Sequence, residues 1–308
     1  MFDVVSVGHF SIDSILLPGR KSPVVILGGS AAYVSIAASR LEARVAVLSK
    51  VGRDFPEAYR WWLRQEGINM SCLMKVENAV TTRFELKYDD TLSSRVLFLK
   101  SVAPPLTVDD VPASLKALAI HVAPIADEIA YDVVKSLKTH ASVLSLDPQG
   151  LVRKHGENGE VSYCSLADKR ILGLVDIYKS SLDEILAVTD LPDLDSAIKG
   201  LHDCGVRIVI VTLGSKGAVV SSREDYYDIP AIKPAKLVDP TGAGDAFVGG
   251  FLAEYINDAN ILRCACVGAA AASFVVEGLG PSSFGDKPQV YERARELYEK
   301  RITERNSQ

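Results

Sequence analysis

Short apolar runs rich in β-branched residues alternate with longer stretches of helical periodicity along most of this 308-residue chain. Apolar strands separated by amphipathic helices are typical of a mostly parallel sheet that helices cover on both faces. The predicted strands are 4–7, 45–49, 119–122, 143–146, 177–179, 208–212 and 218–221. The predicted helices are 31–41, 55–66, 129–138, 194–203, 246–257, 262–277 and 289–300. We therefore expect an α/β fold, whose binding site lies at the carboxyl ends of the strands.

Two regions, 12–27 and 80–101, break this alternation because their apolar residues recur at about every second position. Such a period predicts a small antiparallel sheet with one buried face, with residues 89–91 as the turn between its last two strands. An extension of one edge of the main sheet is the alternative. Because no linker or low-complexity tract divides the chain, we expect residues 1–308 to form a single domain.

The composition excludes several functional classes. The net charge is −5 and the charged residues are interspersed, so no basic face is available for nucleic acid. The five cysteines form no Cys-x-x-Cys pair, and their odd number argues against a disulfide framework. The longest apolar run, 264–276, is too short to span a bilayer, and the chain opens as a strand rather than a basic leader. We expect a cytoplasmic protein whose partners are small molecules.

The segment Asp239-Pro-Thr-Gly-Ala-Gly-Asp245 places a glycine-rich turn directly before an apolar, helix-compatible stretch. Free N–H groups at a helix start attract an anion, and glycine lets the backbone approach it. A carboxylate inside such a turn suits phosphoryl transfer, where it accepts a proton from the attacking hydroxyl. The alternative is an ordinary loop in which Asp245 interacts with the helix dipole, worth about 0.3–1 kcal/mol. The spacing excludes a P-loop and a dinucleotide-binding turn.

The same seven residues resemble the C-terminal motif of the ribokinase-like (PfkB) carbohydrate kinases. Three further segments resemble that family's other motifs: Gly28-Gly-Ser-Ala-Ala-Tyr33, residues 209–218, and Lys179-Ser-Ser-Leu-Asp-Glu184, in which serines replace proline and asparagine. The resemblance runs in order from residue 2 to roughly residue 285. It implies a ribokinase-like three-layer fold, with a mostly parallel central sheet flanked by helices. It also implies that regions 12–27 and 80–101 form a lid over the acceptor, through which a homodimer is one expectation.

The resemblance further implies an ATP-dependent phosphotransferase that acts on an alcohol group. Asp245 is then the general base, and the backbone amides of Gly242, Ala243, Gly244 and Asp245 form the anion hole. Asp239 and Thr241 would help to bind a monovalent cation such as K⁺. Alternatively, Asp239 simply caps the turn by accepting hydrogen bonds from its backbone amides.

On the nucleotide side, the resemblance implies that Glu184 orients Mg²⁺ through water. Asp183 and Glu184 equally fit acidic residues at a helix start that follows a serine cap. Residues 214–217, considered alone, predict only a β-turn between two strands. The residues expected along the ATP molecule are Ser181, Thr212, Gly214, Gly217, Gly242 and Gly244.

On the acceptor side, Asp13 follows the first strand, where a short carboxylate can accept two hydroxyl hydrogen bonds. Gly28 and Gly29 would let the backbone approach the same ligand. Tyr33 stands where many relatives carry asparagine. The remaining expected acceptor contacts are Lys50, Arg83, Gln149 and Arg153, for which surface or lid salt bridges are the alternative.

Three local strings, 28–35, 49–55 and 147–153, look closest to the myo-inositol kinases of that family. A cyclic polyol offers an apolar ring face and a ring of hydroxyls, which one aromatic residue with carboxylate, amide and guanidinium partners would suit. The resemblance thus favours transfer of the γ-phosphoryl group of ATP to a small polyol or sugar, with myo-inositol first. The alternatives are another sugar, a nucleoside, or a catalytically silent ligand-binding relative.

Overall fold

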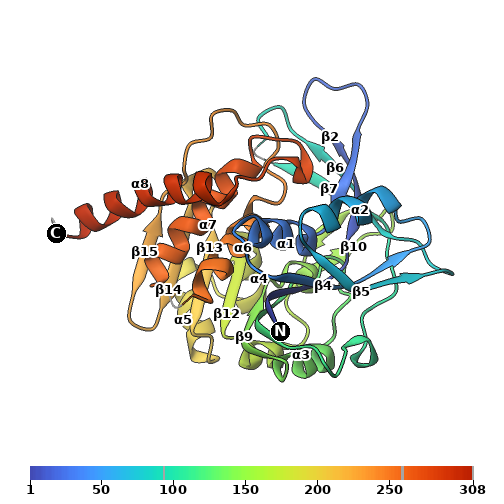
Figure 1. Cartoon of the computed structure of the whole chain (residues 1–308), viewed down its shortest axis with the longest axis horizontal. Helices are drawn as coiled ribbons and strands as arrows, with labels where there is room; N and C mark the ends of the chain where they lie inside the picture. The colour runs from blue at the N-terminus through green and yellow to red at the C-terminus, as the bar shows by residue number, and fades with distance from the viewer. Residues whose placement is uncertain (93, 258–259, 307–308) are drawn as a thin grey trace.

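The computed structural model describes residues 1–92, 94–257 and 260–306, and at its centre lies one large sheet. Its strands are β1 (Phe2–Val7), β4 (Val45–Gly52), β5 (Asn69–Val76), β8 (Ala117–Val122), β9 (Ala141–Leu146), β12 (Ile177–Ser181), β13 (Ile208–Thr212), β14 (Ala218–Ser222) and β15 (Tyr226–Ile229). They lie in the order β15-β14-β13-β12-β9-β8-β1-β4-β5 (Figure 1). The seven strands from β13 to β5 are parallel, and β14 and β15 add an antiparallel edge.

Helices cover both faces of this sheet, as the alternating pattern predicts. The helices are α1 (Ser30–Arg40), α2 (Glu57–Gln65), α3 (Tyr131–Lys138), α4 (Leu182–Thr189), α5 (Leu194–Asp203), α6 (Ala243–Tyr255), α7 (Ile261–Val275) and α8 (Lys287–Asn306). One hydrophobic cluster joins α1, α6 and α7 to one face of the sheet, and a second joins α3, α4 and α5 to the other. The α/β expectation is confirmed, and β5, β15 and α4 are additions to it. Within the described residues, every helix lacks the length or the apolar character that crossing a membrane requires.

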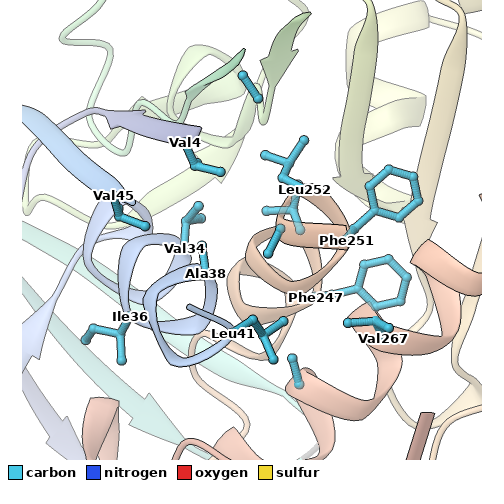
Figure 2. Packing of buried hydrophobic residues seen from close by; sticks show 14 of the residues in the cluster. Val4, Val34, Ile36, Ala38, Leu41, Val45, Phe247, Phe251, Leu252 and Val267 are labelled. Atoms are coloured by element: carbon cyan, nitrogen blue, oxygen red, sulfur yellow. The ribbon is translucent and has the colours of Figure 1, made fainter. Parts of the chain in front are cut away.

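The helices α1 and α6 pack closely beside each other on the sheet. Val34 and Ala38 lie on the side of α1 that faces α6, where Leu252 approaches them (Figure 2). A Cβ atom at Gly249 of α6 would lie 2.6 Å from the carbonyl oxygen of Val34 and 2.8 Å from the Cβ atom of Ala37. Glycine is therefore required here because the two helices approach too closely for any side chain.

A second, four-stranded sheet stands apart from the main one, at the upper right of Figure 1. It consists of β2 (Ser11–Leu16), β3 (Val24–Gly28), β6 (Thr82–Tyr88) and β7 (Arg95–Ser101), in the order β3-β2-β6-β7. An extension of the main sheet is therefore excluded. The expected antiparallel pairing is found between β2 and β3 and between β6 and β7, whereas β2 and β6 pair in parallel. Both leave the main sheet after parallel strands, β1 and β5, and so run in the same direction.

The short hairpin of β10 (Arg153–His155) and β11 (Val161–Tyr163) attaches beside β7. The amide of Leu99 in β7 donates a 2.8 Å hydrogen bond to the carbonyl of Gly159 in the hairpin turn. One face of the small sheet is buried, with Ile15, Phe84 and Leu86 in its hydrophobic cluster. This buried face positions the acceptor side of the site.

We predict that Gly249→Ala destabilises the protein by roughly 1–3 kcal/mol, because the added methyl group overpacks the α1–α6 contact. Helix propensity alone would favour alanine by about 1 kcal/mol, so a net loss measures the steric conflict. Urea unfolding tests this, with Gly173→Ala as the control, because a Cβ atom at Gly173 would meet no atom within 4 Å. Equal stability of the two variants would contradict the close packing.

Candidate active site

The glycine-rich turn forms the amino terminus of α6. Gly242 precedes the helix with φ 79° and ψ 0°, a left-handed conformation that favours glycine. Among the described residues no side chain caps this helix. The amide of Ala243 makes only a long, 3.3 Å hydrogen bond to the carbonyl of Pro240, and the amides of Gly244 and Asp245 stay available to an anion. A Cβ atom at Gly242 would lie 2.1 Å from the ring of Tyr33, which packs directly on the turn.

A pocket of about 60 Å³ lies between this turn and the small sheet. The sequence-predicted residues that line it are Asp13, Gly29, Tyr33, Gln149, Arg153, Thr241, Gly242 and Asp245. Seven lining residues were not predicted: Ser11, Ser30, Phe84, Leu86, Arg95, Leu97 and Ile125. Five of those seven belong to the small sheet, which therefore covers the pocket. In the sequence, these five residues are marked as inward-facing only by their alternation with outward-facing residues along the strands.

Three buried polar atoms in this pocket have no hydrogen-bond partner among the described residues: Ser11 Oγ, Asp13 Oδ1 and the hydroxyl of Tyr33. The three residues are 0%, 6% and 1% exposed, respectively. Leaving such a group unpaired costs about 1–3 kcal/mol, so their convergence points to a ligand that carries hydroxyl groups. Gly28 does not line the pocket, but its missing Cβ makes room for Asp13, whose Oδ2 would lie 1.9 Å away.

The electrostatic setting of Asp13 also fits a polar ligand. Burial raises the pKa of the Asp13 carboxyl group to about 6, although the positive charges of Arg95 and Arg153 oppose this shift. A hydroxyl donor in the pocket would stabilise the carboxylate and offset the cost of its burial.

Gln149 and Arg153 reach the pocket as a linked pair. The Nε2 atom of Gln149 donates to Ser30 Oγ at 2.6 Å, and its Oε1 accepts from Arg153 Nη2. Arg153 Nη1 also donates to the carbonyl of Ile125 at 3.2 Å. These bonds fix an amide and a guanidinium at the wall of the pocket, where the Arg153 guanidinium carbon also lies 5.9 Å from the centre of the Phe84 ring.

Asp245 lies half-buried in the first turn of α6. Burial raises the pKa of its carboxyl group to about 6; the Lys179 ammonium opposes this shift, and the carboxylate of Asp147 adds to it. Lys179 and Asp147 form a buried ion pair, with 2.6 Å between Nζ and Oδ2. A carboxyl group in this setting can exchange a proton near neutral pH.

Asp239 and Thr241 form the first part of the same turn. Asp239 Oδ1 accepts hydrogen bonds from the amide of Thr241 at 2.9 Å and from its hydroxyl at 2.6 Å, and Oδ2 accepts from the amide of Gly280 at 3.2 Å. This is the pattern of a turn cap. A carboxylate has about four acceptor sites, so three are used here and little remains for a cation.

A hydrogen-bond chain joins this turn to the small sheet. The hydroxyl of Thr241 donates to Asp239, which leaves its oxygen to accept from the hydroxyl of Tyr88 in β6, at 2.8 Å. Tyr88 in turn accepts a 2.9 Å hydrogen bond from Arg95 Nη1 of β7. The anion-binding turn and the cover of the pocket are thereby held in one arrangement.

The sequence-predicted nucleotide residues lie at the carboxyl ends of β12 and β13. Ser181 and Glu184 form a capping box at α4, in which Glu184 Oε2 accepts from the Ser181 amide at 2.8 Å. Thr212 Oγ1 would lie 3.7 Å from a Cβ atom at Gly244, so β13 ends beside the anion turn. Packing requires glycine at position 217, because a Cβ atom there would lie 2.0 Å from the carbonyl oxygen of Ile229. Gly214, at φ 60°, has open space around it.

Two residues expected at the acceptor, Lys50 and Arg83, lie outside the pocket lining, so their contact with an acceptor stays a prediction. Lys50 Nζ lies 2.6 Å from Asp110 Oδ2, and Arg83 Nη2 lies 2.7 Å from Asp54 Oδ2. Both side chains are held by these ion pairs. Arg83 also alternates with the inward-facing Thr82 and Phe84, so the strand directs it away from the pocket.

The described residues contain no group of three or more His, Cys, Asp or Glu side chains that could hold a metal ion. Magnesium bound between substrate phosphates keeps several waters and needs only one or two carboxylates. Glu184, whose Oε2 serves the capping box, fits an indirect contact of that kind.

Comparisons with known proteins agree with this geometry. Residues 1–288 match the model of the pfkB family carbohydrate kinases. The cytidine kinase of Thermococcus kodakarensis is 30% identical over 286 residues, which cover 91% of this chain and 98% of that protein. The inositol 3-kinase of Arabidopsis thaliana is 28% identical over 290 residues, covering 91% and 76%. A pyrophosphate-dependent kinase of the ribokinase family, complexed with a pyrophosphate analog and myo-inositol, superimposes with a TM-score of 0.81 and 25% identity over 94% of this chain and 99% of that one.

We predict that Asp245→Asn stabilises the protein above pH 7. The folded-state pKa of about 6 exceeds the ordinary value of 3.8, so the folded state binds the proton more tightly and wild-type stability falls as pH rises between these values. Asparagine removes this loss. Thermal unfolding at pH 4 and pH 8 tests the prediction, with the exposed Asp109→Asn as control. A lower melting temperature for Asp245→Asn at pH 8 would contradict it.

Proposed function

The chain belongs to the pfkB family of carbohydrate kinases, and we propose that it transfers the γ-phosphoryl group of ATP to a hydroxyl of a cyclic polyol, with myo-inositol as the first candidate. The observation that supports this most directly is the pocket itself. It brings the carboxylate of Asp245 and the amino terminus of α6 together with three unpartnered polar atoms suited to hydroxyl groups.

In the proposed step, the acceptor oxygen attacks the γ-phosphorus and forms a new P–O bond. The bond to the β,γ-bridging oxygen breaks, and ADP leaves with its electron pair. The hydroxyl proton passes to the Asp245 carboxylate, so the products are ADP and a phosphate monoester. Amides of Ala243, Gly244 and Asp245 would hold the charge on the transferring group, and each such donor contributes about 3–4 kcal/mol in comparable sites.

Each acceptor contact has a separate task in this proposal. Asp13 would accept hydrogen bonds from two ring hydroxyls, and Gln149 and Arg153 would donate to others. The ring of Tyr33 would contact the apolar face of the acceptor ring, close to Gly242. Lys50 and Arg83 have no task, because their ion pairs hold them elsewhere.

ATP would lie along the ends of β12 and β13, near Ser181, Thr212 and Gly214. Mg²⁺, when bound, would neutralise phosphate charge, and Glu184 would orient its waters. A monovalent cation beside Asp239 is not needed to explain the turn, because hydrogen bonds from Thr241 and Gly280 already satisfy that carboxylate.

A nucleoside is the second candidate acceptor, because the cytidine kinase of Thermococcus kodakarensis matches over nearly the whole chain. A nucleoside also carries ring hydroxyls, which Asp13 would accept. The pocket measures only about 60 Å³ beneath the small sheet, so the added base would demand more movement of that cover than a single-ring polyol does. This difference favours the polyol.

The deciding experiment measures ADP release with ATP and Mg²⁺ for myo-inositol, ribose, fructose and cytidine, followed by identification of the phosphorylated product. We expect the highest kcat/KM with myo-inositol. A higher kcat/KM with cytidine would establish the second candidate instead. Absence of turnover with every acceptor, and with pyrophosphate in place of ATP, would leave the catalytically silent alternative.

We predict that Asp245→Asn lowers kcat by about 10²–10⁴-fold while ATP binding persists, because only proton acceptance is lost. In the wild type, kcat/KM should fall as pH drops through about 6, since a protonated Asp245 cannot accept the hydroxyl proton. Steady-state rates between pH 5 and pH 9 and calorimetric ATP binding measure both effects, with Asp109→Asn as control. Near-wild-type kcat in Asp245→Asn would contradict the assignment.

A further inference from the structure

Lys179 is a buried cation that the proposed mechanism has not yet used. It lies in the middle of β12, two residues before the strand ends, and its side chain is only 6% exposed. Its Nζ donates to Asp147 Oδ2 at 2.6 Å, and the Asp147 side chain is fully buried. Removing two charges from water costs several kcal/mol per ion, and the mutual attraction of the pair repays this only in part. The position of the pair therefore requires an explanation.

The ammonium group of Lys179 lies directly beside the anion-binding turn. A Cβ atom at Gly244 would lie 2.9 Å from Lys179 Nζ and 3.2 Å from its Cε. Gly244 has an ordinary helical conformation, since it is absent from the residues with positive φ in the described chain. Its glycine is thus explained by the approach of the lysine rather than by backbone strain. Because position 244 has no side chain, the Lys179 ammonium group lies next to the amides that would hold a phosphoryl group.

The charges around Lys179 keep it protonated. Burial alone would lower the pKa of its ammonium group, but Asp147, Asp245 and Glu184 outweigh burial and raise this pKa above the ordinary value. An ammonium group has three N–H donors, and Asp147 accepts one of them. The two remaining N–H groups could reach an acceptor atom placed beside Gly244, because Nζ lies next to that residue.

We propose that Lys179 is a catalytic residue that donates a hydrogen bond to the transferring phosphoryl group, and that Asp147 holds it in place for this contact. The inference rests on the proposed kinase function and adds no covalent step to it. Lys179 would balance the negative charge that spreads over the phosphoryl oxygens as the bond to the β,γ-bridging oxygen breaks. Gly244 would be required because any side chain there would displace the ammonium group.

The competing explanation is that Lys179 and Asp147 are only a structural ion pair between β12 and β9. The two explanations differ when both charges are removed together. Replacing a buried pair by neutral residues of similar volume is often neutral or stabilising, so the fold should survive in Lys179→Met/Asp147→Asn. A structural pair would then leave kcat near wild type, whereas a phosphoryl contact would not.

We expect the double variant Lys179→Met/Asp147→Asn to melt close to the wild type and to lose about 10²–10³-fold in kcat, with the KM for the acceptor little changed. Asp147→Asn alone keeps the ammonium group and should retain far more activity than the double variant. If the methionine version does not fold, Lys179→Gln/Asp147→Asn provides the same test. Wild-type kcat in either folded double variant would overturn the proposal.

A matched control removes a second lysine–aspartate pair that lies away from α6. Lys138 Nζ contacts Asp176 Oδ2 at 2.5 Å, between α3 and the segment before β12. Lys138→Met/Asp176→Asn should leave kcat unchanged. A comparable loss of kcat in this control would show that removal of any such pair perturbs the enzyme, and would also overturn the proposal.

Binding measurements keep this inference separate from the kinase proposal. A nonhydrolysable ATP analogue contains the group that would be transferred, and ADP lacks it. We expect the double variant to bind the analogue about 10–100-fold more weakly than the wild type does, with ADP binding little changed. If the wild type turns over no acceptor, the kinase proposal fails, but this comparison still decides the role of Lys179. Equal losses for the analogue and ADP would overturn it.

Discussion

The close packing of α1 against α6 is the constraint on which the rest of the site depends. Because Gly249 has no side chain, the two helices approach until the carbonyl of Val34 meets the α6 backbone. Their amino termini then line one pocket, so that Ser30 of α1 and Asp245 of α6 face the same ligand space. Two helix dipoles directed at one point favour negative charge there. In the proposed function, these helix ends would hold a phosphoryl group, with the carboxylates of Asp13 and Asp245 beside it.

Several charged groups in this region have an opposite charge on another element as a neighbour. Lys179 of β12 pairs with Asp147 after β9, and Arg95 of the small sheet approaches Asp13 and, through Tyr88 and Thr241, the turn capped by Asp239. The small sheet is therefore hydrogen-bonded to the turn of residues 239–245 and also lines the pocket. An acceptor that pushes on this sheet acts on the same hydrogen-bond chain that fixes Thr241 and Gly242. In the proposed reaction, acceptor binding would therefore be coupled to the geometry of phosphoryl transfer through these hydrogen bonds.

The parts of the fold that the sequence predicts are those whose burial leaves a periodic pattern. The interior strands, the main helices and the Asp239–Asp245 turn belong to this class. Strand β5 was missed because its residues 69–76 include Asn69, Ser71 and Lys75 and form an exposed edge, and β15 has only four residues. The parallel pairing of β2 with β6 was missed because the direction of each strand depends on where it leaves the main sheet.

Arg95 lies at the exposed start of β7, yet its guanidinium bends back to Tyr88, and Lys50 is drawn away from the pocket by Asp110. The direction of these two side chains depends on partners that are distant in the sequence or on another strand.

In the proposed function, the choice of acceptor would follow from the register of the small sheet rather than from the glycine-rich turn. Asp13 of β2 lies opposite Phe84 of β6, so a ring whose hydroxyls bond to Asp13 must also lie near that aromatic side chain. The contacts around Asp13 and Asp245 would serve any compact polyol or a ribose ring alike, because hydroxyl hydrogen bonds do not distinguish between them. Discrimination must therefore come from the apolar residues of the cover, Phe84, Leu86 and Leu97, which limit the space beyond the ring. A buried hydrogen-bonding group rejects an analogue far more strongly than an apolar wall does, and this cover offers mainly apolar walls. Selectivity between a polyol and a nucleoside would thus depend on how far the small sheet can move, and the Tyr88–Thr241 hydrogen bond would oppose that movement.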